Sequence, residues 1–244
     1  SKEFNISYED SDGNSKYCHQ TTFGMSERLM GAVVGMHGDD NGLIIPPAIA
    51  PFQIVLMPIA SHIDETVDDK ILELATELSN HGFRIKVDDR DVRPGVKHYD
   101  WEIKGVPLRL ELGPRDIKDD KCIISLRTGG KREVLIENLV DSITQLLDEV
   151  SDELRIRSSN MIKEKIKQLP MINEEDGNLN LSEEIKPGFV YELAFEGSDS
   201  DAEKLEKLTG LTLLGISKNN FKNKRNCSIT GKLTNNRAFI GRMY

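Results

Sequence analysis

Apolar and polar positions follow strand-like and helix-like patterns through the middle of the chain. Residues 53–59 form a continuous apolar run, typical of a strand covered on both faces. Residues 66–80 place apolar side chains at helical spacing, and Gly82 follows as a stop signal. Residues 106–112 alternate between apolar and polar, as in a strand with one buried face. The same patterns predict strands at 83–87 and 122–126, and a helix from Glu133 with Leu135, Leu139, Ile143, Leu146, Leu147 and Val150 facing inward. Residues 51–150 are therefore predicted to form an α/β domain.

The two flanking pieces have weaker patterns. Residues 1–50 are predicted to hold a polar turn, a strand at 18–23, a helix that starts after Arg28 and ends near Gly38, and a buried strand at 43–45. Residues 151–244 are predicted to hold a long polar helix at 151–169, an extended run at 188–195, a short helix at 202–208 and a terminal run at 237–244. The first piece is too small for a domain. We expect it to be the end of a larger domain, and the chain to be a fragment.

Composition narrows the class of protein. The chain has 244 residues, of which 38% are hydrophobic and 30% charged, with a formal net charge of −9. Because no apolar run approaches the ~20 residues of a membrane span, we expect no membrane association. Residues 1–10 lack the pattern of a signal peptide. Cys18, Cys122 and Cys227 have no paired spacing, which favours a reducing cytoplasm over a disulfide framework.

The charge is unevenly distributed along the chain. Residues 81–132 carry thirteen Lys or Arg against nine Asp or Glu, whereas residues 170–206 carry two against eleven. Residues 218–244 have seven basic residues and no acidic ones. The net charge argues against nonspecific nucleic-acid binding over the whole surface, but it leaves room for a local basic face. A solvated face explains such charge runs equally well.

Two places carry candidate chemistry. Arg28 stands where a strand-like run meets a helix-period run, and its fork of five donors suits a phosphate chain, although an ordinary turn and helix cap would use the same residues. Residues 88–105 read as a loop that is too charged to be buried, yet they hold Trp101, the only tryptophan. Interleaved basic and aromatic residues suit unpaired nucleic-acid bases. The alternative is that Trp101 only packs the loop down.

A family resemblance covers most of the chain. Residues 20–51 contain HGDD, a Gly-Leu dipeptide, the pair Pro46–Pro47 and a closing Ala-Pro. Together these resemble motif 3 of class II aminoacyl-tRNA synthetases, in the form used by prolyl-tRNA synthetases of the archaeal and eukaryotic type. The run PGVK followed by WEIKGVPLRLELGPRD resembles the anticodon-binding domain of that family. The chain would then be the C-terminal half of such an enzyme, beginning just before motif 3.

The resemblance implies a fold of three parts. Residues 1–50 would be the end of an antiparallel class II catalytic domain, and residues 51–150 an α/β anticodon-binding domain with a mixed sheet. Residues 151–244 would be a helical linker and a small α+β C-terminal domain, so that the chain is α+β overall.

The resemblance also implies an activity. The parent would be an ATP-dependent ligase that attaches L-proline to tRNA(Pro) through prolyl-adenylate, with Mg²⁺ beside the ATP, as a cytoplasmic homodimer. Arg28 would pair with the ATP phosphates, and Ser26 would help to hold the nucleotide. Thr22, Phe23 and Gly24 would form the floor of the proline pocket. Motif 2 lies outside this sequence, so we expect the isolated fragment to be inactive.

The anticodon-facing positions follow from the same resemblance. The polar positions that match the family are Arg93, Lys97, Glu102, Lys104 and Arg109. A carboxylate accepts hydrogen bonds from a base amino group, and Arg or Lys donates to guanine oxygen and nitrogen. We therefore expect residues 92–105, with the adjoining strand, to recognise the two guanines of the proline anticodon.

Metal sites are not expected. His37, Asp39 and Asp40 either hold a metal or brace the turn after the helix, and the family setting favours the brace. The family's C-terminal domain often holds zinc through four cysteines, but here the turn CSITGK keeps Cys227 and has Thr230 in the second position. One thiolate cannot form a tetrahedral structural site, so we expect no zinc and a buried, apolar Cys227. Tyr244 matches the family's ending and is expected to be ordered.

A second hypothesis is a non-catalytic tRNA- or RNA-binding paralogue that kept the anticodon domain. Arg28 at the strand-to-helix junction favours the catalytic parent, because a pure binding module has no use for a phosphate-pairing arginine. Motifs 1 and 2 directly upstream would distinguish the two.

Overall fold

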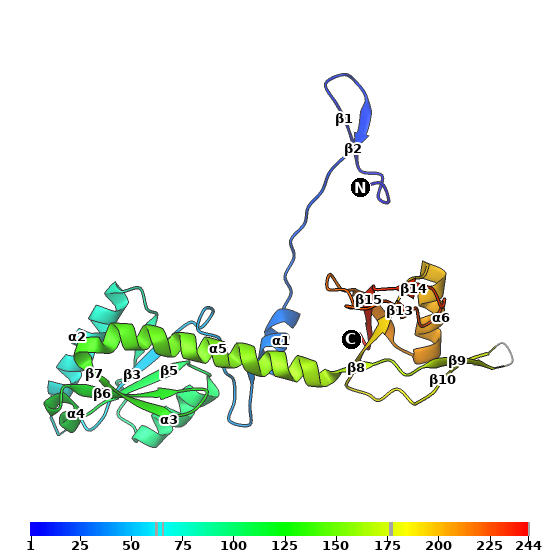
Figure 1. Cartoon of the computed structure of the whole chain (residues 1–244). Coiled ribbons are helices and arrows are strands. Elements are labelled where there is room, and N and C mark those ends of the chain that lie inside the picture. Colours follow the sequence, from blue (N-terminus) through cyan, green and yellow to red (C-terminus); the bar gives the residue numbers. More distant parts are fainter. Residues whose placement is uncertain (62, 65, 176–177, 244) are drawn as a thin grey trace. The chain divides into compact units, whose positions relative to one another are not determined.

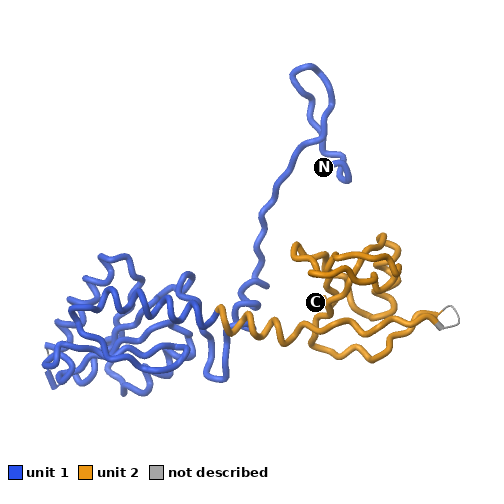
Figure 2. Tube along the Cα trace, in the orientation of Figure 1, with its two compact units in different colours: residues 1–154 blue, residues 155–244 orange. Residues whose placement is uncertain are grey.

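The protein forms two compact units (Figure 2). The structure, a computed structural model, describes residues 1–61, 63–64, 66–175 and 178–243. The first unit covers residues 1–154 and the second covers residues 155–244. Helix α5 (Leu139–Lys165) begins in the first unit and ends in the second. Within the described residues, none of the helices combines the length and the apolar character that crossing a membrane requires.

A five-stranded mixed sheet in the order β4-β3-β5-β6-β7 forms the centre of the first unit (Figure 1). Its strands are β3 (Ile54–Pro58), β4 (Ile85–Val87), β5 (Leu108–Leu112), β6 (Lys121–Leu126) and β7 (Lys131–Leu135). Strand β3 is parallel to both of its neighbours, β4 and β5, while β6 and β7 continue the sheet as antiparallel strands. The α/β domain with a mixed sheet is therefore confirmed.

Helices cover both faces of this sheet, as the apolar run of β3 requires. All five residues of β3 are buried. On one face, α2 (Thr66–Asn80) and the first half of α5 pack against Ile54 and Leu56 of β3 and the leucines of β5. On the other face, α3 (Pro94–Ile103) covers Val55 and Met57 with Trp101. A short helix, α4 (Pro114–Lys118), follows β5.

The prediction of a loop over residues 88–105 is wrong, because much of this segment forms α3. Pro94 occupies the first helical turn, where its missing N–H costs nothing. Lys97 and Trp101, one turn apart, are the buried residues of the helix. The helical spacing is hidden in the sequence because one of these two inward positions is a lysine. Trp101 does pack this segment against the sheet, as the alternative interpretation held.

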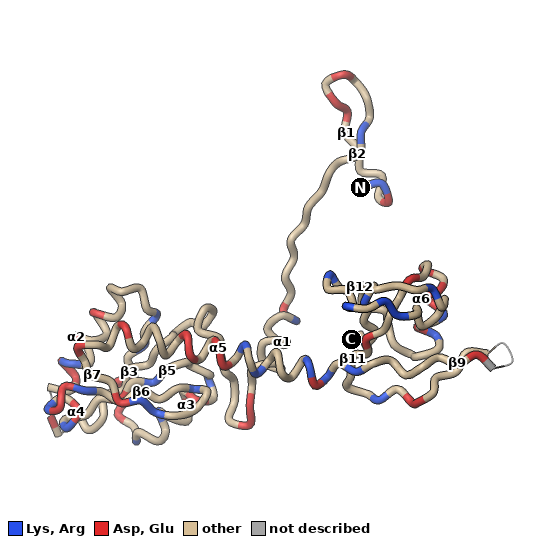
Figure 3. The backbone as a smooth tube through the Cα atoms, in the orientation of Figure 1, with Lys and Arg blue, Asp and Glu red and all other residues tan. Residues whose placement is uncertain are grey.

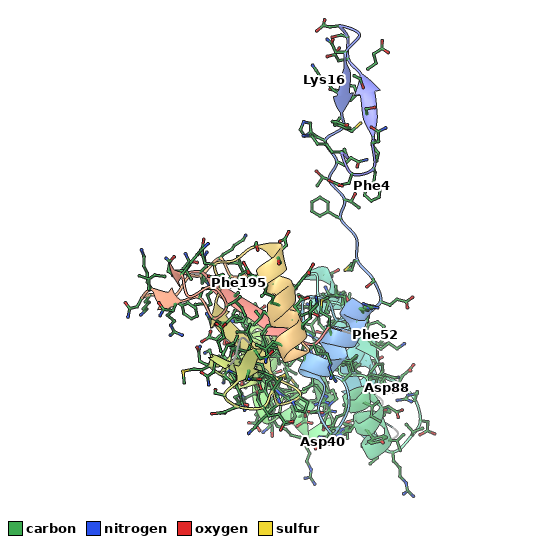
Figure 4. The ribbon with its side chains drawn as sticks, turned by 90° about the vertical axis from the view of Figure 1, so that its right-hand side faces the viewer. Phe4, Lys16, Asp40, Phe52, Asp88 and Phe195 are labelled. Carbon is green, nitrogen blue, oxygen red and sulfur yellow. The ribbon has the colours of Figure 1, made fainter. Side chains whose placement is uncertain are left out.

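Asp88, which follows β4, ties α3 to the sheet (labelled in Figure 4). Its buried carboxylate accepts a hydrogen bond from Trp101 Nε1 at 2.7 Å and two from the Arg90 guanidinium at 2.8 Å. Its carbonyl oxygen accepts from Lys97 Nζ at 2.9 Å, and Arg90 also donates to Asp100. The Arg90 guanidinium, helped by the Trp101 N–H, holds the pKa of Asp88 well below its usual range.

The segment before the sheet is less regular than predicted. Strands β1 (Ser7–Glu9) and β2 (Ser15–Tyr17) form a hairpin around the polar turn. Residues 18–26 then run without regular structure (Figure 1), so the strand predicted at 18–23 is not formed. Helix α1 (Arg28–His37) begins at Arg28 and ends before Gly38, as predicted, and it buries no residue.

Residues 43–45 are also not a strand, although Ile44 is fully buried as predicted. The segment instead runs along the end of α3. The N–H of Leu43 donates to the Ile103 carbonyl at 3.1 Å, and the N–H of Ile45 donates to the Gly105 carbonyl at 3.0 Å. Gly105 permits this approach, because a Cβ there would lie 2.4 Å from the Leu43 carbonyl oxygen. Its φ of +74° also favours glycine.

The predicted helix from Glu133 begins later. Glu133 and Leu135 belong to β7, and Leu135 is exposed, because a hairpin precedes the helix. A 3₁₀ turn, η1 (Ile136–Asn138), then leads into α5. The other five predicted apolar positions are buried along α5. The long polar helix predicted at 151–169 is the continuation of α5, which ends at Lys165, before β8 (Ile166–Gln168).

The second unit is a small α+β fold. Its four-stranded sheet has the order β12-β15-β11-β8. The remaining elements are β9 (Ile172–Glu175), β10 (Asn178–Leu181), β11 (Val190–Ala194), α6 (Asp199–Thr209), β12 (Thr212–Ile216), β13 (Arg225–Asn226), β14 (Leu233–Thr234) and β15 (Arg237–Gly241). The extended run predicted at 188–195 and the short helix predicted at 202–208 are confirmed by β11 and α6, and the terminal run predicted at 237–244 forms a strand over 237–241. The expectation of an ordered Tyr244 lies outside the described residues.

Candidate nucleic-acid interface

A polar cleft of about 320 Å³ opens beside α3 in the first unit. Three elements enclose it: the end of α3 with β5, the β6–β7 hairpin, and the turn of residues 38–42 that follows α1. The side chains that matter for its chemistry are Asp39, Asn41, Glu102, Arg109, Arg127 and Lys131. Two of these, Glu102 and Arg109, are among the predicted anticodon-facing residues. The structure therefore brings this pair together.

Arg109 lies in the cleft with donors to spare. Strand alternation points it away from the leucines of β5 and towards α3. One of its terminal nitrogens, Nη1, donates to the His98 carbonyl at 3.0 Å and lies 3.9 Å from Glu102 Oε2. Its Nε is buried and has no hydrogen-bond partner among the described residues. Burial lowers the pKa of Arg109, and the carboxylates of Glu102 and Glu111 partly offset this effect.

Arg127 forms the buried back of the cleft. Its two terminal nitrogens donate to the two carboxylate oxygens of Asp39 at 2.9 and 2.6 Å, and its Nε donates to the Glu102 carbonyl at 2.9 Å. Such a bidentate pair is among the strongest hydrogen-bonded arrangements available to side chains. Asp39 thus braces the turn after α1, as the family setting favours for it. For Asp40 and His37 the bracing role stays a prediction.

Further charges lie at the rim. Glu111 on β5 is 3.3 Å from His98 Nε2 and 3.5 Å from Lys131 Nζ. Near Lys131, the Thr128 hydroxyl is buried without a hydrogen-bond partner among the described residues. The cleft therefore offers unpaired donors, two carboxylates and a flexible ammonium group. These groups suit a flat ligand that carries both donors and acceptors on its edge, such as a nucleic-acid base.

The other predicted anticodon residues lie elsewhere. Lys97 is buried and its ammonium group donates to the Asp88 carbonyl, so that it supports α3 from within. Arg93 is exposed at the start of α3, at the opposite end of the helix from Glu102. Lys104 is exposed, with its ammonium group 4.4 Å from the centre of the Trp101 ring. Contact of these three residues with RNA stays a prediction.

Sequence reasoning missed Arg127 and Lys131. A signal was present, because Gly129–Gly130 separates two strand-like runs and this dipeptide is typical of a β-hairpin. The prediction of a helix from Glu133 left no room for the second strand of this hairpin, β7. The register of β6 and β7 pairs Ser125 with Lys131 across the hairpin. Residues from both strands therefore reach the same cleft.

The predicted ATP and proline residues lie along the irregular segment before α1. Thr22, Phe23, Gly24 and Ser26 belong to residues 18–26, and Arg28 opens the helix. All five are exposed. Phe23 has 95% of its surface accessible, so the described residues do not enclose a pocket around it. Their assignment to a nucleotide and proline site stays a prediction.

Comparison with known proteins agrees with the fold. A family model described as an anticodon binding domain matches residues 53–146, which include the whole mixed sheet. The fold and this match thus define the class of the protein: it carries an anticodon-binding domain of the kind found in aminoacyl-tRNA synthetases. The whole of the chain, moreover, matches one kind of synthetase.

Curated relatives and a solved structure identify the family. A proline–tRNA ligase of Thermococcus kodakarensis is 41% identical over 88% of this chain and 44% of its own length. A proline–tRNA ligase of Methanocorpusculum labreanum is 38% identical over 100% of the chain and 50% of its own length. The prolyl-tRNA synthetase of Cryptosporidium parvum, solved with halofuginone and AMPPNP, superposes with a TM-score of 0.82 at 30% identity, over the whole chain and 51% of its own. The chain belongs to the prolyl-tRNA synthetase family, and it spans about half the length of the curated relatives it matches.

Cys227 differs from the simple apolar residue that was predicted. It is buried, but its sulfur accepts hydrogen bonds from the backbone N–H of Glu196 at 3.2 Å and of Thr230 at 3.5 Å. Burial alone would raise the pKa of the thiol, and the hydrogen bonds from Thr230 and Glu196 reverse this and lower it. The Thr230 hydroxyl donates to the Glu196 carbonyl at 2.9 Å. This turn is therefore closed by its own hydrogen bonds.

The three cysteines should differ sharply in reactivity. Burial raises the pKa of the Cys122 thiol to about 12. Since the thiolate is the nucleophile, Cys122 should resist iodoacetamide at pH 8 while the folded state persists. Cys18, which is only partly buried, should be alkylated first. Peptide mass spectrometry after timed labelling measures the order, and a denatured sample supplies the control. Labelling of Cys122 as fast as Cys18 in the folded protein would contradict this prediction.

Proposed function

We propose that the protein to which this chain belongs attaches L-proline to tRNA(Pro) with ATP, through prolyl-adenylate, and that the cleft beside α3 reads the anticodon. The observation that carries the second part is the cleft itself. Most of its lining residues lie within the region matched by the anticodon-binding model, and it offers the buried Nε of Arg109 and hydroxyl of Thr128 without partners among the described residues. Buried donors of this kind are costly unless a ligand satisfies them.

The chemistry of the cleft fits guanine, which occupies the second and third positions of the proline anticodon. Guanine presents the acceptors O6 and N7 and a donor amino group at N2. Arg109 and Lys131 would donate to the acceptors, and the Glu102 carboxylate would accept from the amino group. A base that lacks the amino group, or carries a donor in place of O6, leaves these side chains unpaired.

The affinity for tRNA should come from specific hydrogen bonds and ion pairs rather than from the overall charge of the chain. Basic and acidic residues are interspersed along β5, β6 and β7 (Figure 3). The chain as a whole has a net charge of −9, which disfavours indiscriminate binding of RNA. Base contacts specify the sequence, while a few phosphate contacts hold the strand in register. Arg93 and Lys104, both exposed on α3 or beside it, are proposed for the phosphate contacts.

The catalytic part of the proposal concerns the segment before α1. Arg28 would neutralise the ATP phosphates, with Mg²⁺ beside them, and Ser26 would hold the nucleotide. Thr22, Phe23 and Gly24 would line the proline pocket. Adenylate formation depends on charge neutralisation and alignment, which an arginine supplies without changing its protonation. We further propose a cytoplasmic homodimer without structural zinc. The cytoplasmic location fits three cysteines that are all free.

Binding of tRNA(Pro) tests the anticodon reader directly. We expect the chain to bind a tRNA(Pro) transcript more tightly than a transcript with both anticodon guanines replaced, at fixed salt. Each guanine contact is worth about 1–3 kcal/mol, so the combined loss should exceed tenfold. Arg109→Gln and Glu102→Gln should each reduce this discrimination. Fluorescence anisotropy of labelled transcripts is the measurement.

The matched control is Lys86→Gln. Lys86 is exposed on edge strand β4, away from the cleft, and its replacement removes one positive charge as Arg109→Gln does. Discrimination should be unchanged in this variant. Equal affinity of the unaltered chain for both transcripts would refute the assignment of the cleft.

A further inference from the structure

The turn of residues 38–42 is attached to the cleft from outside the anticodon-binding match, which begins at residue 53. It follows α1 directly, and Asp40, on this turn, is labelled in Figure 4. Asp39 pairs with Gly42 through backbone hydrogen bonds, so the turn is closed on itself. Asp39 and Asn41 both line the cleft. The segment that follows α1, at the opposite end of this helix from Arg28, thus supplies one wall of the proposed base site.

An ion pair holds the turn in this place. The Arg127 side chain is 2% exposed, and both of its terminal nitrogens donate hydrogen bonds to the Asp39 carboxylate. Its third nitrogen, Nε, donates to the Glu102 carbonyl. Arg127 therefore joins the turn to the end of α3. Since a buried arginine that loses its carboxylate keeps an uncompensated charge, the pair is expected to break only at considerable cost.

The backbone of the turn also lies close to the backbone of α3. At Gly42, whose φ is +128°, a Cβ would lie 2.8 Å from Ile103 Cα and 2.9 Å from the Ile103 carbonyl oxygen. The N–H of Leu43, the next residue, donates to that same carbonyl. The turn is therefore fixed to α3 at two points: at Asp39 through Arg127, and at Gly42–Leu43 through Ile103.

Asn41 lies between two hollows. It lines the cleft described above and also a neighbouring hollow of about 360 Å³, which Tyr99 of α3 borders as well. Glu102 lines both, and the Asn41 amide nitrogen is 3.4 Å from Glu102 Oε1. Tyr99 is 63% exposed, which leaves its ring free to stack on a base. Asn41 and Glu102 thus form a polar partition between two spaces, each large enough for one base.

We propose that the turn of residues 38–42 is a wall of the base-reading site, with Asn41 as a specificity-determining residue and Asp39 as the positioning residue that holds it. This inference rests on the proposed function of the cleft. Two consecutive guanines occupy the two hollows, and the partition contacts both. The Asn41 side chain donates and accepts, so it complements the guanine edge beside the Glu102 carboxylate.

Asp39→Asn tests the positioning role, with Glu77→Gln as the matched control. Both changes remove one negative charge, but Asp39 is paired with Arg127, whereas Glu77 is exposed on α2 and lines neither hollow. We expect Asp39→Asn to lose about tenfold in the ratio of affinities for tRNA(Pro) and the guanine-replaced transcript. Its affinity for the replaced transcript should stay the same. In hydrogen exchange, the amides of Asn41, Gly42 and Leu43 should exchange faster, while Glu77→Gln matches the unaltered chain in both measurements.

Asn41→Ala separates the base contact from the fold, because Asn41 is exposed. It should reduce discrimination without changing exchange at Leu43. Trp101 fluorescence confirms that each variant keeps α3 packed. If the unaltered chain discriminates guanine and both Asp39→Asn and Asn41→Ala discriminate equally well, the inference is overturned and the proposed function stands. If the unaltered chain does not discriminate at all, both the inference about the turn and the proposed function of the cleft are refuted.

Discussion

Replacing Asp88 with alanine should unfold the first unit at markedly lower urea concentration. Asp88 is 2% exposed, and its carboxylate accepts four hydrogen bonds, one from Trp101 and three from Arg90. Without it, a buried indole N–H loses its acceptor and a cation loses its buried partner. The Arg90 side chain is 44% exposed, so water replaces part of its lost ion pair, and the unsatisfied indole N–H should account for most of a loss of about 1–3 kcal/mol. Trp101 is the only tryptophan, so its fluorescence reports this unfolding directly.

Asp89→Ala is the matched control for this variant. Asp89 is the exposed next residue, and its replacement should change the free energy of unfolding by less than about 0.5 kcal/mol. The pH dependence gives a second check. Because the folded-state pKa of Asp88 is depressed, its contribution is fully present above the unfolded-state value of about 3.9 and is lost as the pH falls below it. The difference between the unaltered chain and Asp88→Asn should therefore shrink below about pH 4. A constant difference down to pH 2 would contradict this origin of the stability.

Gly105→Ala should also be strongly destabilising. The backbone is left-handed, with φ of +74°, which costs a residue with a Cβ about 1–3 kcal/mol. In addition, the new Cβ would lie 2.4 Å from the oxygen and 2.6 Å from the carbon of the Leu43 carbonyl. The segment at 43–45 must then move away from α3. We expect a total loss of at least about 3 kcal/mol in urea denaturation.

Gly82→Ala separates these two causes. Gly82 has φ of +87°, but no atom lies within 4 Å of a Cβ there. Its replacement should cost only the backbone term, about 1–2 kcal/mol. The difference between the variants measures the close approach of residues 43–45 to the end of α3. Equal losses would mean that this approach contributes nothing.

The success of sequence reasoning follows the physical strength of each pattern. Helix α2 was predicted with its observed bounds, because its inward residues are aliphatic and a glycine ends it. The strand β5 was predicted because strict alternation of apolar and polar residues is typical of a strand and does not fit a helix. Helix α3 was missed because Lys97 occupies an inward position, where tertiary hydrogen bonds rather than hydrophobicity keep it. Local periodicity does not record such a partner.

The candidate site likewise contains some residues that local sequence predicts and others that only the fold reveals. Glu102 and Arg109 were recognised because they lie within a contiguous stretch that resembles a known domain. Asp39 and Arg127 are 88 positions apart, and neither carries a local pattern that predicts the other. Only the folded chain brings the turn after α1 to the β6–β7 hairpin. Residues that act through a partner distant in sequence are invisible to motif reading, however clear their geometry.

The strand order of the central sheet has a consequence for synthesis on the ribosome. Both neighbours of β3 follow it in the chain, since β4 begins at Ile85 and β5 ends at Leu112. The five buried residues of β3 therefore emerge from the exit tunnel long before either neighbour is available. Unpaired apolar strands are prone to aggregate until their partners arrive. At about 5–20 residues per second, this nascent segment waits for several seconds, during which α2 can already cover the Ile54 and Leu56 face of the strand.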